Sequence, residues 1–135
     1  GNIIAKIRCE TMPPMATVRT AEKNQKNIVI GIGYGAKDSI TEIKTLAEKT
    51  GAALSATRKM VDNDYLPYDI QVGLTGKSVS PDVYIALGIS GAVHHIAGMR
   101  QSGTVIAVNT DSQAPIFKYS DYGIVADINE ILSLL

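Results

Sequence analysis

Short apolar runs alternate along this chain with polar or glycine-rich segments, at the spacing expected of strands joined by helices and turns. The runs at residues 27–31 (NIVIG), 83–87 (VYIAL) and 104–109 (TVIAVN) are almost continuously apolar, which is typical of strands covered on both faces of a sheet. Residues 20–27 are polar and predict a connector, and residues 60–76 predict a long loop. Shorter runs predict further strands at residues 3–9, 15–19, 53–57, 70–72 and 123–126.

Helical spacing of apolar residues follows Ser39. Ser39 and Glu42 have the spacing of a capping box, which predicts the start of a helix, and Gly51 predicts its end. Further helices are expected from residue 90 or 91 and from residue 127 or 128. Alternating strands and helices predict an α/β fold, a three-layer, mostly parallel sheet with helices on both faces (Rossmann-like). We expect a single domain over residues 1–135, with residues 1–26 as entry strands and connector.

Composition narrows the classes of ligand. The chain has 13 Lys and Arg residues against 13 Asp and Glu residues, and no basic stripe that would favour nucleic acid or an anionic membrane surface. Its apolar runs are too short for membrane insertion. The single cysteine, Cys9, excludes an internal disulfide and a Cys-based metal site.

The glycine-rich turn at residues 88–91 (GISG) joins a buried strand to a predicted helix. Such a turn lets a ligand approach the main chain closely, and a helix N-terminus offers unpaired N–H groups to a phosphate. The turn therefore indicates a nucleotide-type ligand held by its diphosphate. Glycine also occurs at such turns to pack a helix against a sheet, and that alternative stays open.

Four other predicted strand ends carry groups suited to ligand contact: residues 31–35 (GIGYG), Thr57 with Arg58, residues 73–76, and Asn109. Because the carboxyl ends of parallel strands meet at one edge of a sheet, we expect these segments to form one site with the turn at residues 88–91.

Three segments, YIALGISGAVHHIAGM (84–99), TVIAVNTDSQAPIF (104–117) and DYGIVAD (121–127), closely resemble the carboxyl-terminal FAD-binding domain of the electron transfer flavoprotein alpha subunit. QVGLTGK (71–77), LSATR (54–58) and PPMATVRT (13–20) are similar to other segments of that family. The resemblance covers essentially the whole chain. It does not include the family's amino-terminal domain, which we expect to be absent from this sequence.

This resemblance implies a function. The family binds FAD and carries electrons from flavin dehydrogenases to a membrane or soluble acceptor, without substrate chemistry of its own, so the chain is expected to be an electron carrier and not an enzyme. The family works as a heterodimer with a beta subunit that completes the flavin pocket. The expected location is the cytoplasm of a bacterium or archaeon, with the mitochondrial matrix as the alternative.

The resemblance also implies the residues that contact FAD. Arg58 would lie over the flavin, Thr75 near its N5 atom, and His95 at its pyrimidine end, as a donor or imidazolium. Ser90 would reach the diphosphate, and Asn109 and Asp127 the adenosine half. The implied set is Thr57, Arg58, Gln71, Val72, Gly73, Leu74, Thr75, Ser90, Gly91, Ala92, Val93, His94, His95, Asn109, Asp127 and Ile128.

Several of these residues have a structural alternative. Ser90 and Asp127 are also good helix caps, Asn109 is a good turn residue, and Arg58 and His94 are also typical of surfaces.

Two other functions stay open. One is an NAD-dependent enzyme on a related fold. The other is a module whose cofactor site has decayed, suggested by Ile32 and Leu74, where many family members have Arg and Gln.

Overall fold

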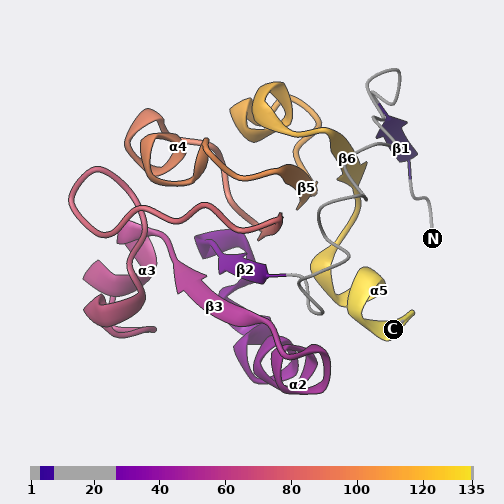
Figure 1. The fold of residues 1–135 in the computed structure, drawn as a ribbon. Helices are drawn as coiled ribbons and strands as arrows, with labels where there is room; N and C mark the ends of the chain where they lie inside the picture. The colour runs from indigo at the N-terminus through magenta and orange to yellow at the C-terminus, as the bar shows by residue number, and fades with distance from the viewer. Residues whose placement is uncertain (1–3, 8–26, 135) are drawn as a thin grey trace, which may run out of the picture.

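The computed structural model describes residues 4–7 and 27–134 (Figure 1). It contains one six-stranded sheet in the order β1-β6-β5-β4-β2-β3. All neighbouring strands are parallel except β1 and β6, which are antiparallel. The strands are β1 (Ile4–Ile7), β2 (Ile28–Ile32), β3 (Ala53–Ala56), β4 (Val83–Leu87), β5 (Thr104–Asn109) and β6 (Tyr122–Val125).

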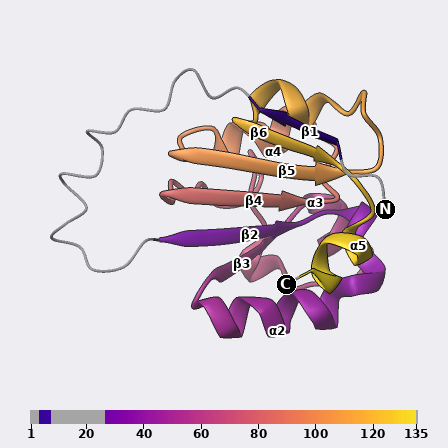
Figure 2. The same ribbon diagram turned by 90° about the vertical axis from the view of Figure 1, so that its right-hand side faces the viewer.

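Four α-helices and three 3-10 segments connect these strands in the described part of the chain. The α-helices are α2 (Ile40–Thr50), α3 (Arg58–Asp62), α4 (Val93–Met99) and α5 (Ile128–Ser133). The 3-10 segments are η2 (Tyr34–Ser39), η3 (Tyr68–Ile70) and η4 (Pro115–Tyr119). In Figures 1 and 2, α4 and η4 cover one face of the sheet, and α2 and α5 cover the other. The predicted three-layer α/β fold is confirmed.

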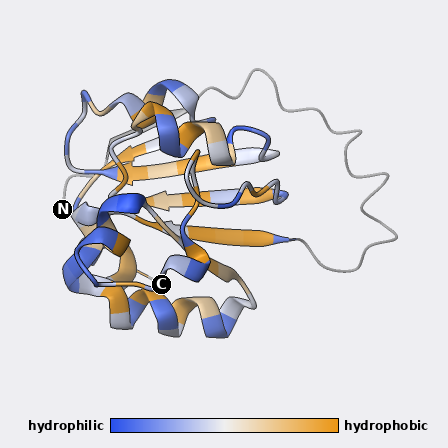
Figure 3. Ribbon diagram, turned by 90° about the vertical axis from the view of Figure 1, so that its left-hand side faces the viewer, coloured by the Kyte–Doolittle hydropathy of each residue, from blue (hydrophilic) through white to orange (hydrophobic). Residues whose placement is uncertain are grey.

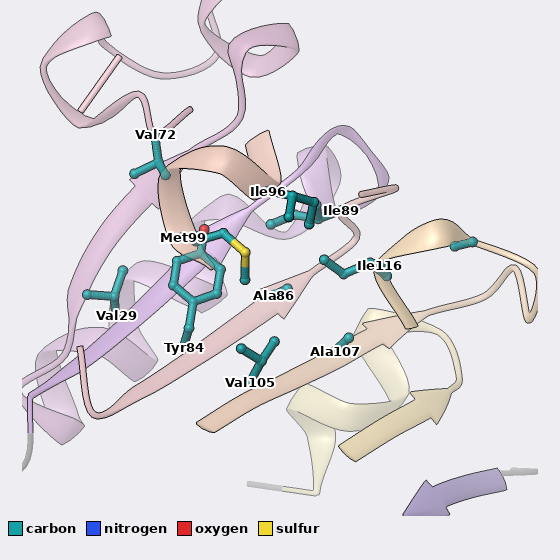
Figure 4. Packing of buried hydrophobic residues seen from close by; sticks show 11 residues of the cluster. Val29, Val72, Tyr84, Ala86, Ile89, Ile96, Met99, Val105, Ala107 and Ile116 are labelled. Atoms are coloured by element: carbon teal, nitrogen blue, oxygen red, sulfur yellow. The ribbon is translucent and has the colours of Figure 1, made fainter. Parts of the chain in front are cut away.

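The core has two halves, one on each face, because successive strand residues point to opposite sides. Tyr84 and Ala86 of β4 pack in the cluster under α4, whereas Leu87 belongs to the cluster under α2 and α5 (Figure 4). Hydrophobic residues dominate the strands, while the helices carry hydrophilic residues on their outer sides (Figure 3). Because both faces of the sheet are covered, the central strands have continuous apolar runs in the sequence rather than an alternating pattern.

The direction in which the chain adds strands to the sheet reverses between β2 and β4. From β2 the chain crosses to β3 on one side, and from β4 it crosses to β5 on the other. At this switch point the two carboxyl ends are joined: the Gly33 N–H donates to Leu87 O (2.9 Å), and the Gly35 N–H donates to Gly88 O (3.1 Å). In sheets of this kind the space beyond the switch point is the usual place for a ligand.

Several predictions of local structure are wrong. Residues 70–72 do not form a strand: η3 ends at Ile70, and Gln71 and Val72 make only isolated bridges, to Ala56 and Lys77. Helix α3 was not predicted, since five residues give no visible helical period. The predicted strand at residues 15–19 and the connector at 20–26 lie outside the described residues.

The predicted start of α2 after Ser39 and its end at Gly51 are confirmed, whereas the predicted start of α4 is wrong. The Ser39 hydroxyl does not cap α2 but donates to Asn129 Oδ1 in the last helix (2.7 Å). Helix α4 begins at Val93, because Gly91 has φ +100° and keeps the turn out of helical geometry. Gly51 ends α2 with φ 76°, and its N–H donates to Ala47 O.

Candidate functional site

A cavity of about 520 Å³ lies at the carboxyl edge of the sheet, directly beyond the switch point. The segments that follow β2, β3 and β4, the end of β5 with the residues after it, and the segment after η3 converge on it, as the strand-end argument predicts. Of the residues singled out from the sequence, those lining the cavity are Thr57, Arg58, Val72, Gly73, Leu74, Thr75, Ser90, Ala92, His94, His95 and Asn109. Gln71, Gly91, Val93, Asp127 and Ile128 do not line it.

The end of β3 brings positive charge and one unusual hydroxyl to the cavity. Arg58 and Lys59 both line it, and Arg58 Nε forms an ion pair with Asp62 (3.3 Å) in which both side chains stay largely exposed. Lys59 Nζ lies 4.3 Å from the centre of the Tyr34 ring. Thr57 Oγ1 is buried and has no hydrogen-bond partner. An unsatisfied buried hydroxyl is costly, so this atom suits a ligand that brings its own polar group.

The loop at residues 71–77 forms a second wall and is held by bonds within the protein. The N–H groups of Val72, Gly73 and Leu74 donate to Ala56 O, Lys77 O and His94 O respectively. These three main-chain donors are therefore engaged by the protein itself. Of the loop residues that line the cavity, Thr75 alone has an N–H without an acceptor in the described structure.

Gln71 does not line the cavity but supports this wall through a hydrogen bond to Thr75. Its side chain is buried, and its Nε2 donates to Thr75 Oγ1 (2.9 Å). The Tyr68 hydroxyl donates to the Thr75 carbonyl (2.9 Å). Because Oγ1 accepts from Gln71, the hydroxyl hydrogen of Thr75 is left to point elsewhere, which suits donation to a ligand.

The turn at residues 88–91 packs against other loops more than it opens space for a ligand. A Cβ on Gly88 would lie 2.5 Å from Ala36 N, and one on Gly91 would lie 2.7 Å from Ile116 Cα. Both glycines therefore allow close packing between loops, and Gly88 also lines the cavity. Ser90 is exposed, lines the cavity and does not cap the helix.

The two neighbouring histidines of α4 differ sharply in solvent exposure. His94 is exposed, whereas His95 is buried. The His95 ring lies between β4 and the loop at residues 71–77, with Nε2 2.9 Å from the Tyr84 hydroxyl and Nδ1 3.0 Å from Val72 O. Burial lowers the pKa of His95 to about 4 from the usual 6.5, so the ring is neutral at pH 7.

This burial predicts an acid sensitivity. A histidine in the unfolded chain binds its proton near pH 6.5, whereas folded His95 stays neutral until about pH 4. The unfolded state therefore binds more protons in this window, and the free energy of unfolding is expected to fall by about 2 kcal/mol from pH 7 to pH 5. Urea titrations at both pH values test this. His95→Gln should remove the fall, and His94→Gln should keep it; a fall unchanged by His95→Gln would contradict the assignment.

The far end of the cavity lies beyond β5. Asn109 Nδ2 donates to Ile89 O (3.0 Å), and its Oδ1 accepts from the Asp111 N–H (2.9 Å), so this side chain organises the turn that it begins. Asp127 caps α5, since its Oδ1 accepts from the Asn129 N–H (2.8 Å). Ile128 is buried in the core.

Several lining residues were not singled out from the sequence as contacts. They are Tyr34, Gly35, Lys59, Gly88, Ile89, Asp111, Ala114 and Pro115. Tyr34, Gly35, Gly88 and Ile89 lie within segments expected at the edge, but the others carry no pattern of their own. Within the described residues, no group of His, Cys, Asp and Glu side chains could hold a metal ion. The same residues include no helix with the length and hydropathy to cross a membrane.

The fold and the position of the cavity define a Rossmann-like α/β domain. Residues 22–100, more than half of the chain, match the family model described as "Electron transfer flavoprotein FAD-binding domain". The chain belongs to this family.

The chain is similar to several proteins named electron transfer flavoprotein subunit alpha. The chain is 50% identical over 102 residues to the electron transfer flavoprotein subunit alpha of Paracoccus denitrificans, covering 76% of this chain and 33% of that protein. It is 50% identical over 105 residues to the mitochondrial protein of that name from Oryza sativa subsp. indica, covering 78% and 29%. For the Bacillus subtilis protein the identity is 45% over 121 residues, covering 88% and 37%. The chain thus spans about a third of the length of these relatives.

Proposed function

We propose that this chain is the carboxyl-terminal FAD-binding domain of an electron transfer flavoprotein alpha subunit, which carries electrons from flavin dehydrogenases to a downstream acceptor. The observation that carries the proposal is the cavity at the switch point, where five separate segments of the chain converge. Family membership supports FAD as the ligand. The proposed cofactor contacts are the residues implied by the resemblance that line the cavity, with Gln71 acting through Thr75.

The residues present fit this cofactor. The unpartnered Thr57 hydroxyl needs a polar group from a ligand, and a dinucleotide offers many. Arg58 and Lys59 give the wall positive charge that suits a diphosphate or a reduced flavin. Bound FAD would supply the redox chemistry, and the protein would position it and set its electrostatics.

Ile32 and Leu74, the two residues that suggested a decayed cofactor site, do not support that alternative. Ile32 is fully buried in the core under α2 and α5, so its side chain takes no part in the cavity. Leu74 lines the cavity, but its N–H already donates to His94 O. Its side chain, 64% exposed, therefore offers only apolar contact to a ligand.

Arg58 is expected to raise the reduction potential of bound FAD. A guanidinium next to the flavin ring would favour its reduced, more negative form by about 1–2 kcal/mol, equivalent to about 40–85 mV for a one-electron couple. Arg58→Met should lower the potential by that amount in a spectroelectrochemical titration. Arg100→Met, an exposed change outside the cavity wall, is the matched control. Equal potentials in both variants would contradict the role of Arg58.

The proposed partners are the beta subunit in a heterodimer, and dehydrogenases and an acceptor in transient contact. The proposed location is the bacterial or archaeal cytoplasm or the mitochondrial matrix. The deciding experiment is co-expression of the full-length protein with its beta subunit, followed by desalting and an absorption spectrum. A retained flavin band is expected. A complex that lacks flavin, or one stabilised by NAD and not by FAD, would overturn the proposal.

A further inference from the structure

A lysine ammonium group lies against an aromatic ring at the wall of the cavity. The ring belongs to Tyr34, which begins η2 and lines the cavity, and Lys59 Nζ lies 4.3 Å from its centre. The Tyr65 ring meets the Tyr34 ring edge-on, with 6.2 Å between the two centres and 73° between the two planes. A cation is attracted to the face of an aromatic ring. Lys59, although exposed, therefore has a preferred position at the cavity wall.

A second lysine, Lys37, approaches the same ring but has a different charge environment. Its Nζ lies 5.2 Å from the centre of the Tyr34 ring and 3.3 Å from Asp38 Oδ2. The hydrogen bond to this carboxylate and its negative charge raise the pKa of Lys37. Neither Lys37 nor Asp38 lines the cavity. The charge of Lys37 is thus balanced by a neighbour outside the cavity wall.

Lys59 has no such carboxylate partner in the part of the chain that the structure describes. The ion pairs found there join Lys37 to Asp38 and Arg58 to Asp62. The carboxylate of Asp111 also belongs to the cavity lining, but Asp111 follows β5, which lies two strands from β2 in the sheet. A cation that lines a cavity and has no counter-ion suits an anionic group of a ligand.

The position of Lys59 favours the diphosphate of the cofactor as that group. Tyr34 lies between Gly33 and Gly35, whose N–H groups donate to main-chain carbonyls at the end of β4. The ring that holds Lys59 is therefore fixed at the switch point, in the turn after the first parallel strand, where sheets of this kind hold the diphosphate of a dinucleotide. The unpartnered hydroxyl of Thr57, two residues before Lys59, lies in the same wall.

We propose that Lys59 is a cofactor-binding residue whose ammonium group pairs with the diphosphate of the bound dinucleotide, and that Tyr34 is the positioning residue that holds it at the cavity wall. The inference rests on the proposed function and deepens it. It divides the work of the two neighbouring cations: Arg58 acts on the flavin, and Lys59 on the phosphates. Since the charge of the diphosphate does not change when the flavin is reduced, Lys59 should strengthen the binding of both redox states equally.

The first test is Lys59→Met in the full-length heterodimer, freed of FAD and titrated with it. The affinity for FAD should fall by about tenfold, because a charge-assisted hydrogen bond is lost. The reduction potential of the bound FAD should not change. Added salt should weaken FAD binding to the wild type more than binding to the variant. Lys37→Met removes the other lysine beside the same ring and is the matched control, which should change neither affinity nor potential.

The outcomes separate this inference from the proposed function. A wild-type heterodimer that does not bind FAD would refute the proposed function. If the wild type binds FAD and Lys59→Met binds it equally well, the inference alone fails. Equal losses of affinity in Lys59→Met and Lys37→Met would show a general effect of charge and refute a direct contact. A lowered reduction potential in Lys59→Met would place the lysine at the flavin and overturn its assignment to the diphosphate.

The second test concerns Tyr34. Tyr34→Leu removes the ring and should weaken FAD binding by about threefold, since the free lysine must then be immobilised when the cofactor binds. Tyr34→Phe keeps the ring and should retain the wild-type affinity. In the double variant of Tyr34→Leu and Lys59→Met, the affinity should equal that of Lys59→Met alone, because Tyr34 acts only through the lysine. Additive losses in the double variant, or a loss in Tyr34→Phe as large as in Tyr34→Leu, would refute the role of the ring.

Discussion

Thr57→Val should make the ligand-free chain more stable by about 1–2 kcal/mol and yet weaken FAD binding by about tenfold. Valine has the same shape as threonine and removes a buried hydroxyl that has no partner. The unfolded chain hydrates that hydroxyl, whereas the folded chain without ligand leaves it unbonded. Opposite signs for stability and affinity would mark Thr57 as a residue selected for binding. Urea unfolding and FAD titration measure the two quantities.

Thr45→Val is the matched control for this experiment. The Thr45 hydroxyl is exposed and donates to the Thr41 carbonyl within α2 (3.1 Å), far from the cavity wall. We expect no gain in stability and no change in affinity. If Thr57→Val destabilises the chain, or leaves FAD affinity unchanged, the hydroxyl is not a ligand contact.

Gly88→Ala should cost about 3 kcal/mol or more of folding free energy and abolish FAD binding. Gly88 has φ +68°, which is strained for alanine, and its Cβ would lie 2.7 Å from Gly35 C. Left-handed strain contributes about 1–2 kcal/mol and forced separation of the packed loops about 1–3 kcal/mol. Because these loops close the switch point, separating them also distorts the cavity. Denaturant unfolding and FAD titration test both effects.

Gly51→Ala separates strain from crowding. Gly51 has a similar φ of +76°, but a Cβ there would meet nothing within 4 Å. This variant should therefore lose only about 1 kcal/mol and keep full affinity for FAD. Equal losses in the two variants would show that backbone strain alone, and not loop packing at the switch point, governs the effect at Gly88.

The sheet and the location of the site were predictable because they follow from local patterns and one general rule. Continuous apolar runs mark β2, β4 and β5, and parallel strands bring their carboxyl ends to one edge. Together they predict that Thr57, Ser90 and Asn109 lie at one site, and all three line the same cavity. This prediction of a shared site needs only that the strands are parallel and not their exact order in the sheet.

The contacts that the sequence did not reveal depend on register or on distant partners. Tyr84 reads as one more apolar strand residue, and its bond to Ser55 requires the pairing of β2 with both neighbours. The Ser39 hydroxyl has the spacing of a helix cap but finds Asn129, 90 residues away. The bonds of His95 to Val72 and Tyr84 likewise depend on partners that its spacing in the sequence does not show.

In the loop at residues 71–77 every N–H except that of Thr75 donates to a main-chain carbonyl of the protein, and Gln71 and Tyr68 anchor Thr75 from behind. Its conformational entropy is thus lost during folding rather than on association with a cofactor. Because this wall of the cavity is ordered before the ligand binds, little further conformational entropy is lost on binding. This preorganisation increases the affinity for the ligand. It would also allow a flavin to leave and re-enter without reorganising that wall.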